Sequence, residues 1–397
     1  MRAALFVVTS VATLSCTPPK PSKDVSLDLV ARLENASPGE RDRLVREAIE
    51  RNGGTPLVEG DSALFLVEGS SDGPPPRLLA DFNGWGEPED RLAEAAMTLL
   101  EGTSWYYLER TLDPRARIEY AIARESTEDD ALHLDPENPR TVEGFSRSYS
   151  ELRMPAYPDA PELLDDPSIP RGRLVETEIE SRIRGNRRKI LVYLPAGYED
   201  GDRRYPTAYF GDGSDYVSRV PVPRILDYVI ARGGVRPLVG VFIEPMPRSE
   251  EYRMNEDYGR FVAEELVPWI DSRYRTIDSA EARAVLGGSR GGLAAADVAY
   301  SHADTFGACG AIAPAASPTN LIDVIAQGEV KPVRFFVLVG LYDLDWRPDG
   351  IALYDVLRSK GYDVEFLEIP EGHSWNAWKS YIDDVLMVLF PAERRTS

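Results

Sequence analysis

The segment from Ala284 to Ala294 places a serine between closely spaced glycines, where an apolar run meets an alanine-rich stretch. The apolar run reads as a buried strand and the alanine-rich stretch as a helix. Gly287 and Gly291 allow a sharp turn around Ser289, because glycine has no Cβ atom to crowd the chain. A strand–turn–helix of this kind exposes a serine hydroxyl above the edge of a sheet. The segment therefore predicts a nucleophilic serine in an α/β protein, with an ordinary tight turn as the alternative.

Strand-like and helix-like stretches alternate from about Gly172 to the C-terminus. Continuous apolar runs are typical of a sheet covered on both faces. Alternation of strands with helices predicts a largely parallel sheet. The expected strands cover residues 189–194, 207–210, 238–243, 284–286, 335–339 and 364–369, and the expected helices cover 258–274, 350–360 and 374–390.

Serine is a weak nucleophile unless a base removes its proton, and the chain has only three histidines. His373 follows the last expected strand, in Glu371-Gly372-His373-Ser374-Trp375. His133 belongs to the N-terminal half, and His302 ends the helix after Ser289, where we expect it to be exposed. His373 is therefore the expected base.

The acid that orients the histidine is expected after the preceding strand. Asp343 and Asp345 both follow the run 335–339, and Asp343 is preferred because it comes first. A Ser–His dyad without an acid remains the alternative. For the oxyanion, the expected donors are the backbone N–H of Arg290 and that of Gly213 or Ser214, in the turn after the strand 207–210.

These residues resemble the esterase family that includes bacterial enterochelin (enterobactin) esterases, esterase D and related carbohydrate esterases. The resemblance covers roughly residues 172–390 and implies an α/β-hydrolase fold and ester hydrolysis. Its motifs are the strand and turn Tyr205 to Gly213, the helix Phe261 to Tyr274, the serine turn, and the segment Gly361 to Trp378.

The same resemblance implies that Arg248 and Glu251 lie near the substrate, with Trp375 beside the histidine as a further candidate. The chain departs from the family pattern at several positions. Tyr252 replaces a leucine, and Glu371 replaces a glycine before the histidine. Gly288 and Arg290 flank the serine where Gln and an apolar residue are common. These departures lie beside the pocket and leave the substrate open.

Residues 37–153 are expected to form a helix over 38–52 and a small immunoglobulin-like β-sandwich, since short apolar runs alternate there with turns. Ala80 to Trp85 resembles a turn of starch- and glycogen-associated modules, and Leu134 to Pro139 resembles a segment of the siderophore esterases' first domain. For the first turn, simple packing is an equal alternative. Residues 154–171 contain scattered prolines and are the expected linker to the esterase domain, 172–397.

The first sixteen residues have the layout of a secretory signal, with Arg2, an apolar run and Cys16 at the expected cut. We expect Cys16 to be lipidated, with ordinary signal cleavage and an incidental Cys16 as the alternative. Residues 17–36 are expected to be a tether, and the protein to be exported as a periplasmic or outer-membrane-anchored lipoprotein. That anchor is the only expected membrane contact. The formal charge of −21 argues against nucleic acid as a partner.

No cofactor or metal is expected, because three dispersed histidines and two cysteines do not form the usual ligand clusters. The predicted function is a serine carboxylic-ester hydrolase that works through an acyl-enzyme. Its substrate would be a siderophore lactone or a feruloyl or acetyl carbohydrate ester. The alternatives are a non-catalytic glycan-binding protein and an acyltransferase, as in the mycolyltransferase relatives of the family.

Overall fold

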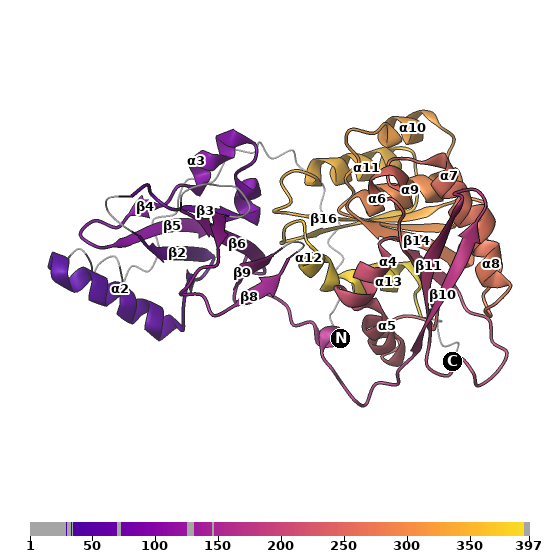
Figure 1. Cartoon of the computed structure of the whole chain (residues 1–397), viewed down its shortest axis with the longest axis horizontal. Helices are drawn as coiled ribbons and strands as arrows, with labels where there is room; N and C mark the ends of the chain where they lie inside the picture. Colours follow the sequence, from indigo (N-terminus) through magenta and orange to yellow (C-terminus); the bar gives the residue numbers. More distant parts are fainter. Residues whose placement is uncertain are drawn as a thin grey trace.

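The computed structural model describes residues 29, 33, 35–69, 73–124, 131–144 and 147–392. The expected signal segment, Cys16 and nearly all of the tether lie outside the described residues. The structure places a smaller, sheet-rich part beside a larger α/β part (Figure 1).

Two antiparallel sheets pack face to face in the smaller part. The first has the order β1 (Leu57–Glu59), β2 (Ser62–Glu68), β5 (Trp105–Thr111) and β4 (Thr98–Leu99). The second has the order β3 (Arg77–Ala80), β6 (Arg117–Ala123), β9 (Ser148–Arg153) and β8 (Thr141–Glu143), with β7 (Leu132–His133) paired to β6. Short helical segments η1 (Asp81–Gly86), η2 (Glu89–Arg91) and α3 (Leu92–Ala95) follow β3.

The sandwich core lies between these sheets, where Phe65 of β2 meets Tyr120 of β6 at 5.0 Å between ring centroids. Helix α2 (Pro38–Asn52) covers the outer face of the first sheet, and its Val45 packs near Trp105. The helix starts after Ser37 and ends at Gly53, as its sequence predicts. Gly53 has a φ of 78°, the left-handed conformation that glycine adopts most readily.

The larger part is built on an eight-stranded sheet in which all pairs from β13 to β17 are parallel. The two strands at one edge are antiparallel. The order is β10 (Arg173–Ser181), β11 (Asn186–Leu194), β13 (Val239–Ile243), β12 (Thr207–Phe210), β14 (Arg283–Gly288), β15 (Ala308–Ile312), β16 (Arg334–Gly340) and β17 (Val364–Ile369).

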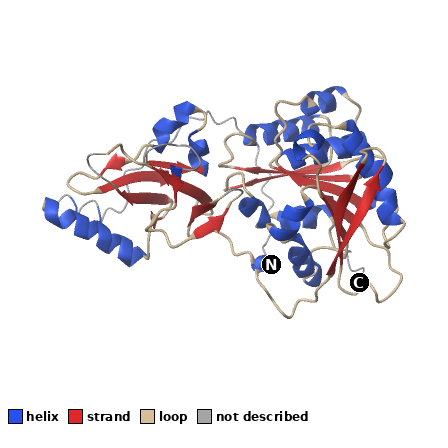
Figure 2. Cartoon of the chain, viewed as in Figure 1, coloured by secondary structure: helices blue, strands red, loops and turns tan. Residues whose placement is uncertain are grey.

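Helices cover both faces of this sheet (Figure 2). Alternate side chains of one strand enter different cores, so that Val285 packs on one face and Leu286 on the other. One core includes α7 (Glu256–Arg260), η5 (Phe261–Leu266), α8 (Val267–Asp271), α9 (Arg290–Ser301), α10 (Leu321–Gln327) and α11 (Arg347–Ser359). The other includes α4 (Gly213–Ser218), α5 (Val222–Ala231), α12 (Trp375–Lys379) and α13 (Ile382–Leu389). The remaining short segments are η4 (Pro161–Leu163), α6 (Arg248–Glu251) and η6 (Ala280–Ala282). This α/β-hydrolase architecture is the predicted fold.

Two predicted helices are interrupted. The stretch 258–274 contains a π-helical turn, η5, just before Pro268, whose ring nitrogen has no N–H to continue the α-helical pattern. The stretch 374–390 is broken between Lys379 and Ile382, where Ser380 is buried and its Oγ lies 3.0 Å from Tyr157 Oη.

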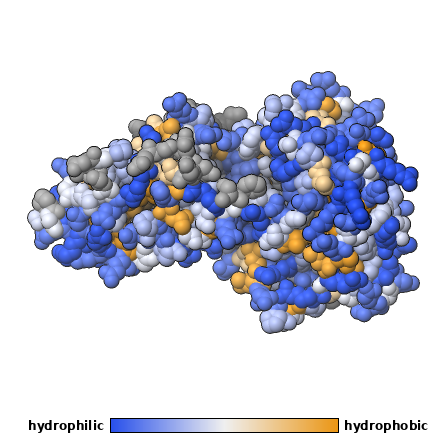
Figure 3. Space-filling model, viewed as in Figure 1, coloured by the Kyte–Doolittle hydropathy of each residue, from blue (hydrophilic) through white to orange (hydrophobic). Residues whose placement is uncertain are grey.

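The face of the molecule shown in Figure 3 is mainly hydrophilic, with small apolar patches. Within the described ranges, the helices are too short or too polar to cross a bilayer.

Candidate active site

Ser289 lies at the carboxyl end of β14, in the turn that leads into α9. Its φ of 57° and ψ of −125° are rarely adopted by any residue other than glycine. The neighbouring glycines are required for space. A Cβ atom on Gly287 would lie 2.2 Å from the carbonyl oxygen of Gly291, and one on Gly292 would lie 2.9 Å from that of Ile312. The tight packing thus holds a strained, partly exposed serine at the N-terminus of a twelve-residue helix.

His373 and Asp343 face each other at the same edge of the sheet. Asp343 follows β16 and His373 follows β17, and both strands are parallel to β14. His373 Nδ1 lies 2.7 Å from Asp343 Oδ2. The Asp343 side chain is buried and also accepts a hydrogen bond from the Trp346 N–H at 3.1 Å. The carboxylate is therefore fixed on both sides before any ligand binds.

Asp345, the other predicted acid, lies elsewhere. Its carboxylate pairs with Arg91 of the sandwich at 2.9 Å and is half exposed. Asp343 and Asp345 are thus two positions apart in the sequence, but only the first of the two contacts His373.

Trp378 links the serine turn to the histidine. Its ring lies 5.1 Å from that of His373, edge to face. A Cβ atom on Gly288, next to Ser289, would lie 2.7 Å from the same tryptophan. The buried Trp378 ring therefore contacts both His373 and the residue next to Ser289. Among the described residues, no hydrogen bond joins the Ser289 hydroxyl to His373; without ligand, such bonds are often long.

The predicted oxyanion donors lie at two adjacent turns. The N–H groups of Arg290 and Gly213 are each in the first turn of a helix, and in the described part of the chain neither donates to another group. Ser214 differs, because its N–H and its Oγ both donate to Glu244 Oε2, at 3.2 and 2.6 Å. Gly213 therefore fits the donor role and Ser214 does not.

Arg248 lies beside this turn. It makes a two-pronged hydrogen bond to Asp212, at 2.7 and 2.9 Å, and its side chain is 40% exposed. Burial raises the pKa of Asp212, and Arg248 opposes that shift. Asp212 has a φ of 52° and lies close to Gly291. Arg248 thus remains partly open to a ligand while it supports the turn.

Glu251 has a different environment from the one expected. It is fully buried, accepts from Arg188 and Arg184, and also accepts from the Met246 N–H at 2.8 Å. A carboxylate with all its lone pairs used in this way fixes the loop after β13 and has no face open to substrate. The substrate contact expected of Glu251 does not fit this burial.

Aromatic side chains surround His373. Trp375 is partly exposed, and its ring lies 4.8 Å from that of Trp378 and 5.3 Å from that of Tyr216. The partly exposed Trp346 lies 6.5 Å from the imidazole. Trp346 was not singled out from the sequence, although it follows the two candidate aspartates directly.

The other histidines are distant from this arrangement. His133 lies in β7 of the sandwich. His302 is half-buried against Gly259, contrary to the exposure expected, and burial lowers its pKa.

The turn Ala80 to Trp85 is occupied by its own contacts. Trp85 Nε1 donates to Asp81 Oδ1 at 3.2 Å, and the Trp85 ring packs on Tyr149 at 4.7 Å. Asn83 is buried and bonds back to Leu78 and Ala80. These contacts favour the packed-turn alternative over an open glycan site.

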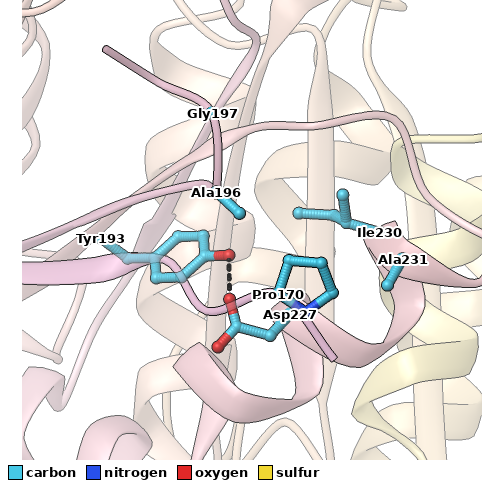
Figure 4. Close-up of a pocket in the computed structure, with 7 residues that line it drawn as sticks. All are labelled: Pro170, Tyr193, Ala196, Gly197, Asp227, Ile230 and Ala231. Atoms are coloured by element: carbon cyan, nitrogen blue, oxygen red, sulfur yellow. Dashed lines mark hydrogen bonds between the residues drawn. The ribbon is translucent and has the colours of Figure 1, made fainter. Parts of the chain in front are cut away.

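A pocket of about 330 Å³ lies at the other edge of the sheet (Figure 4). Tyr193 and Asp227 meet there at 2.7 Å. Because β11 is antiparallel to β13, Tyr193 at its end lies toward the amino ends of the parallel strands, opposite Ser289. The pocket is therefore separate from the serine site.

Across the described ranges, no group of three or more His, Cys, Asp or Glu side chains is placed to hold a metal ion.

Comparison with known proteins gives a family match. The model of the family described as "Putative esterase" matches residues 181–383, about half of the chain. The iron(III) enterobactin esterase of Escherichia coli is 28% identical over 261 residues, which are 62% of this chain and 64% of that protein. The endo-1,4-beta-xylanase/feruloyl esterase of Xylanibacter ruminicola is 25% identical over 239 residues, 56% of this chain and 32% of that protein.

Among solved structures, the ferric enterobactin esterase of Salmonella typhimurium superposes with a TM-score of 0.69 at 20% identity. The match covers 86% of this chain and 98% of that one. The likeness therefore extends beyond the α/β part and includes most of the sandwich.

Proposed function

Since this chain belongs to the family described as "Putative esterase" and is a carboxylic ester hydrolase, we propose that it works through a Ser289–His373–Asp343 triad. The observation that carries this proposal is the 2.7 Å contact between His373 and Asp343, at the same sheet edge as the strained Ser289.

In the proposed reaction, Ser289 Oγ attacks the ester carbonyl and His373 Nε2 takes its proton. The tetrahedral intermediate then expels the alcohol, which receives that proton, and leaves an acyl group on Ser289. Water attacks the acyl-enzyme in the same way and releases the acid. Asp343 keeps the proton on His373 Nδ1, so that Nε2 is free to act as the base, and it stabilises the imidazolium.

The negative oxygen of each intermediate would lie between the N–H groups of Arg290 and Gly213. In the described part of the chain neither N–H donates to another group, and that of Arg290 begins the twelve-residue helix α9, whose N-terminus favours negative charge. Such donors contribute about 3 kcal/mol each to lowering the barrier in related chemistry.

For the substrate, we propose an ester of an aromatic acid, either a siderophore lactone or a feruloylated carbohydrate, with an acetylated sugar as the less favoured choice. The partly exposed rings of Trp375 and Trp346 near His373 offer apolar surface for an aromatic acyl group. The names of the E. coli and X. ruminicola relatives support the same two classes. Arg248 is the proposed contact for an acidic or phenolic group of the substrate.

The test is hydrolysis of a p-nitrophenyl ester by the wild type and by Ser289→Ala. We expect the variant to lose at least about 10³-fold in kcat. Equal rates for the two proteins would contradict the proposal. A panel of ferric-siderophore lactones, feruloyl sugars and acetyl sugars then identifies the substrate class by kcat/KM.

Export and lipid anchoring at Cys16 are a further part of the proposal. Radiolabelled palmitate is expected to enter the wild type and not Cys16→Ala when each is expressed in a bacterial host. Incorporation into both proteins would contradict the assignment of Cys16.

A further inference from the structure

Arg117 of β6 lies in the contact between the sandwich and the α/β part, and its side chain is 2% exposed. Its Nε donates to Glu371 Oε2 at 2.6 Å. Its Nη2 donates to Ser374 Oγ at 3.3 Å and to Glu119 Oε1 at 3.2 Å. One guanidinium of the sandwich therefore contacts residues on both sides of His373.

The histidine loop, residues 370–374, meets the sandwich at almost every position. The Pro370 carbonyl accepts from the Arg117 N–H at 3.2 Å. Gly372 lies so close to the sandwich that a Cβ atom on it would be 2.3 Å from Asp81 Cγ. Ser374 Oγ donates to Glu119 at 2.8 Å. Between these contacts, the imidazole of His373 bonds to Asp343 of the α/β part.

The remaining groups of this cluster tie it to neighbouring segments. Glu371 also accepts from Tyr157 Oη at 3.2 Å, and the N–H of Asp113 donates to Tyr342 Oη, next to Asp343, at 2.9 Å. Glu119 accepts from Asn376 Nδ2 at 3.1 Å, and Glu151 lies 3.3 Å from Arg117. The loops that carry the base and the acid are thus both bonded to the sandwich.

We propose that Arg117 is a positioning residue of the esterase: by binding Glu371 and Ser374 it sets the place of His373, so that the sandwich completes the active site. The inference rests on the proposed catalytic role of His373. It also gives a role to Glu371, whose buried carboxylate accepts the hydrogen bond from Arg117 Nε.

The physical reason is the cost of isolated buried charge. Glu371 and Glu119 are buried with Arg117, and removing one member of such a cluster leaves the others uncompensated. Arg117 and Glu371 therefore have their charged partners only when the histidine loop lies against β6. A displacement of the imidazole by about 1 Å is expected to cost about 100-fold in rate.

The experiment compares Arg117→Met with a matched control, Arg283→Met. Arg283 is also buried, at 5% exposed, and binds Asp271 and the exposed Asp278 at 2.6 Å each. It begins β14 at the end opposite Ser289. Both variants lose a buried cation between carboxylates. Only Arg117 touches the histidine loop.

We expect Arg117→Met to lower kcat on a p-nitrophenyl ester by about 100-fold per folded molecule with little change in KM. Arg283→Met is expected to lose stability but to keep the wild-type kcat per folded molecule. Circular dichroism measures the folded fraction of each variant. A purely structural role for Arg117 would move stability alone, so an unchanged kcat per folded molecule would overturn the inference.

If Arg117→Met does not fold, Glu371→Gln tests the same inference. Glutamine has the same shape and still accepts from Arg117 Nε, so we expect the protein to fold. A neutral amide holds the guanidinium less tightly than a carboxylate does, so we expect kcat to fall by about 10-fold with an unchanged KM. Wild-type kcat in this variant would overturn the inference. If the wild type and Ser289→Ala hydrolyse the ester equally, the proposed function fails. If Ser289→Ala is inactive but Arg117→Met and Glu371→Gln keep the wild-type kcat, only the inference about Arg117 fails.

Discussion

At the residue scale, the assignment of the acid depends on two aspartates two positions apart. Asp343 is buried and bonds to His373, whereas Asp345 is half exposed and bonds to Arg91. A buried carboxylate that orients a histidine affects the rate directly, and a surface ion pair adds little to stability.

Asp343→Asn is therefore expected to lower kcat by about 10³-fold or more, because the amide favours the wrong imidazole tautomer. Asp345→Asn serves as the matched control, with kcat close to that of the wild type. Steady-state kinetics on one ester measures both. An equal loss of kcat in the two variants would contradict the assignment of Asp343 as the acid. It would indicate that the whole loop, and not Asp343 alone, supports catalysis.

Glu371 gives a second prediction at this scale. Burial raises its pKa from 4.5 to about 7, although Arg117 opposes the shift. Burial likewise raises the pKa of Asp81 in the same cluster. Because the folded protein binds the proton of Glu371 more tightly than the unfolded chain, this contribution to stability is full below pH 4.5 and is lost as the pH rises through about 7.

As the pH rises from 4.5 to about 7, the free energy of unfolding of the wild type should therefore fall relative to that of Glu371→Gln, whose side chain cannot titrate. Urea unfolding at several pH values measures the difference. A constant difference across the range would show that Glu371 does not titrate in this window.

At the element scale, the turn between β14 and α9 depends on backbone atoms that pack against each other. Gly287 approaches the backbone of Gly291, and neither partner can move aside as a flexible side chain could. The strained conformation of Ser289 is kept only because the strand and the helix around it are buried.

Gly287→Ala is expected to lower the free energy of unfolding by about 2 kcal/mol or more and to remove ester hydrolysis. Gly39→Ala in α2 is the control, since a Cβ atom there meets nothing within 4 Å and alanine favours the helix by up to about 1 kcal/mol. Urea unfolding checks both. A tolerated Gly287→Ala would mean that the turn can open without loss of the fold.

At the scale of the whole molecule, the sandwich and the α/β part share polar contacts beyond Arg117. Arg219 Nη1 donates to the Gly144 carbonyl at 2.8 Å, and Asn376 Nδ2 donates to the Glu143 carbonyl at 2.8 Å. Together with the buried Arg117 cluster, these partly buried bonds are expected to couple the unfolding of the two parts.

The wild type is therefore expected to unfold in one calorimetric transition. Arg117→Met should split it into two, with the sandwich melting first, because the interface loses its buried cation. Arg283→Met should lower the transition without splitting it. Two transitions already present in the wild type would contradict this coupling.

The α/β alternation and the strand–turn–helix around Ser289 could be predicted from the sequence, and so could the position of His373 after the last strand. These follow from local patterns: the period of apolar residues, the glycines around Ser289, and the position of a histidine after a strand. The N-terminal helix could be predicted to its last residue for the same reason, since its cap and its terminating glycine are adjacent in the chain.

Three further distinctions needed the fold: Asp343 contacts His373 whereas Asp345 pairs with Arg91, Glu251 is buried in an ion pair, and the Ser214 N–H is bonded to Glu244. The tertiary structure also showed that Asp81 and Arg117 pack against the histidine loop. Arg117 and Glu371 are 254 positions apart, and no local period relates them. Burial and pairing of charge depend on which surfaces meet when the parts fold together, and that is a property of packing rather than of spacing along the chain.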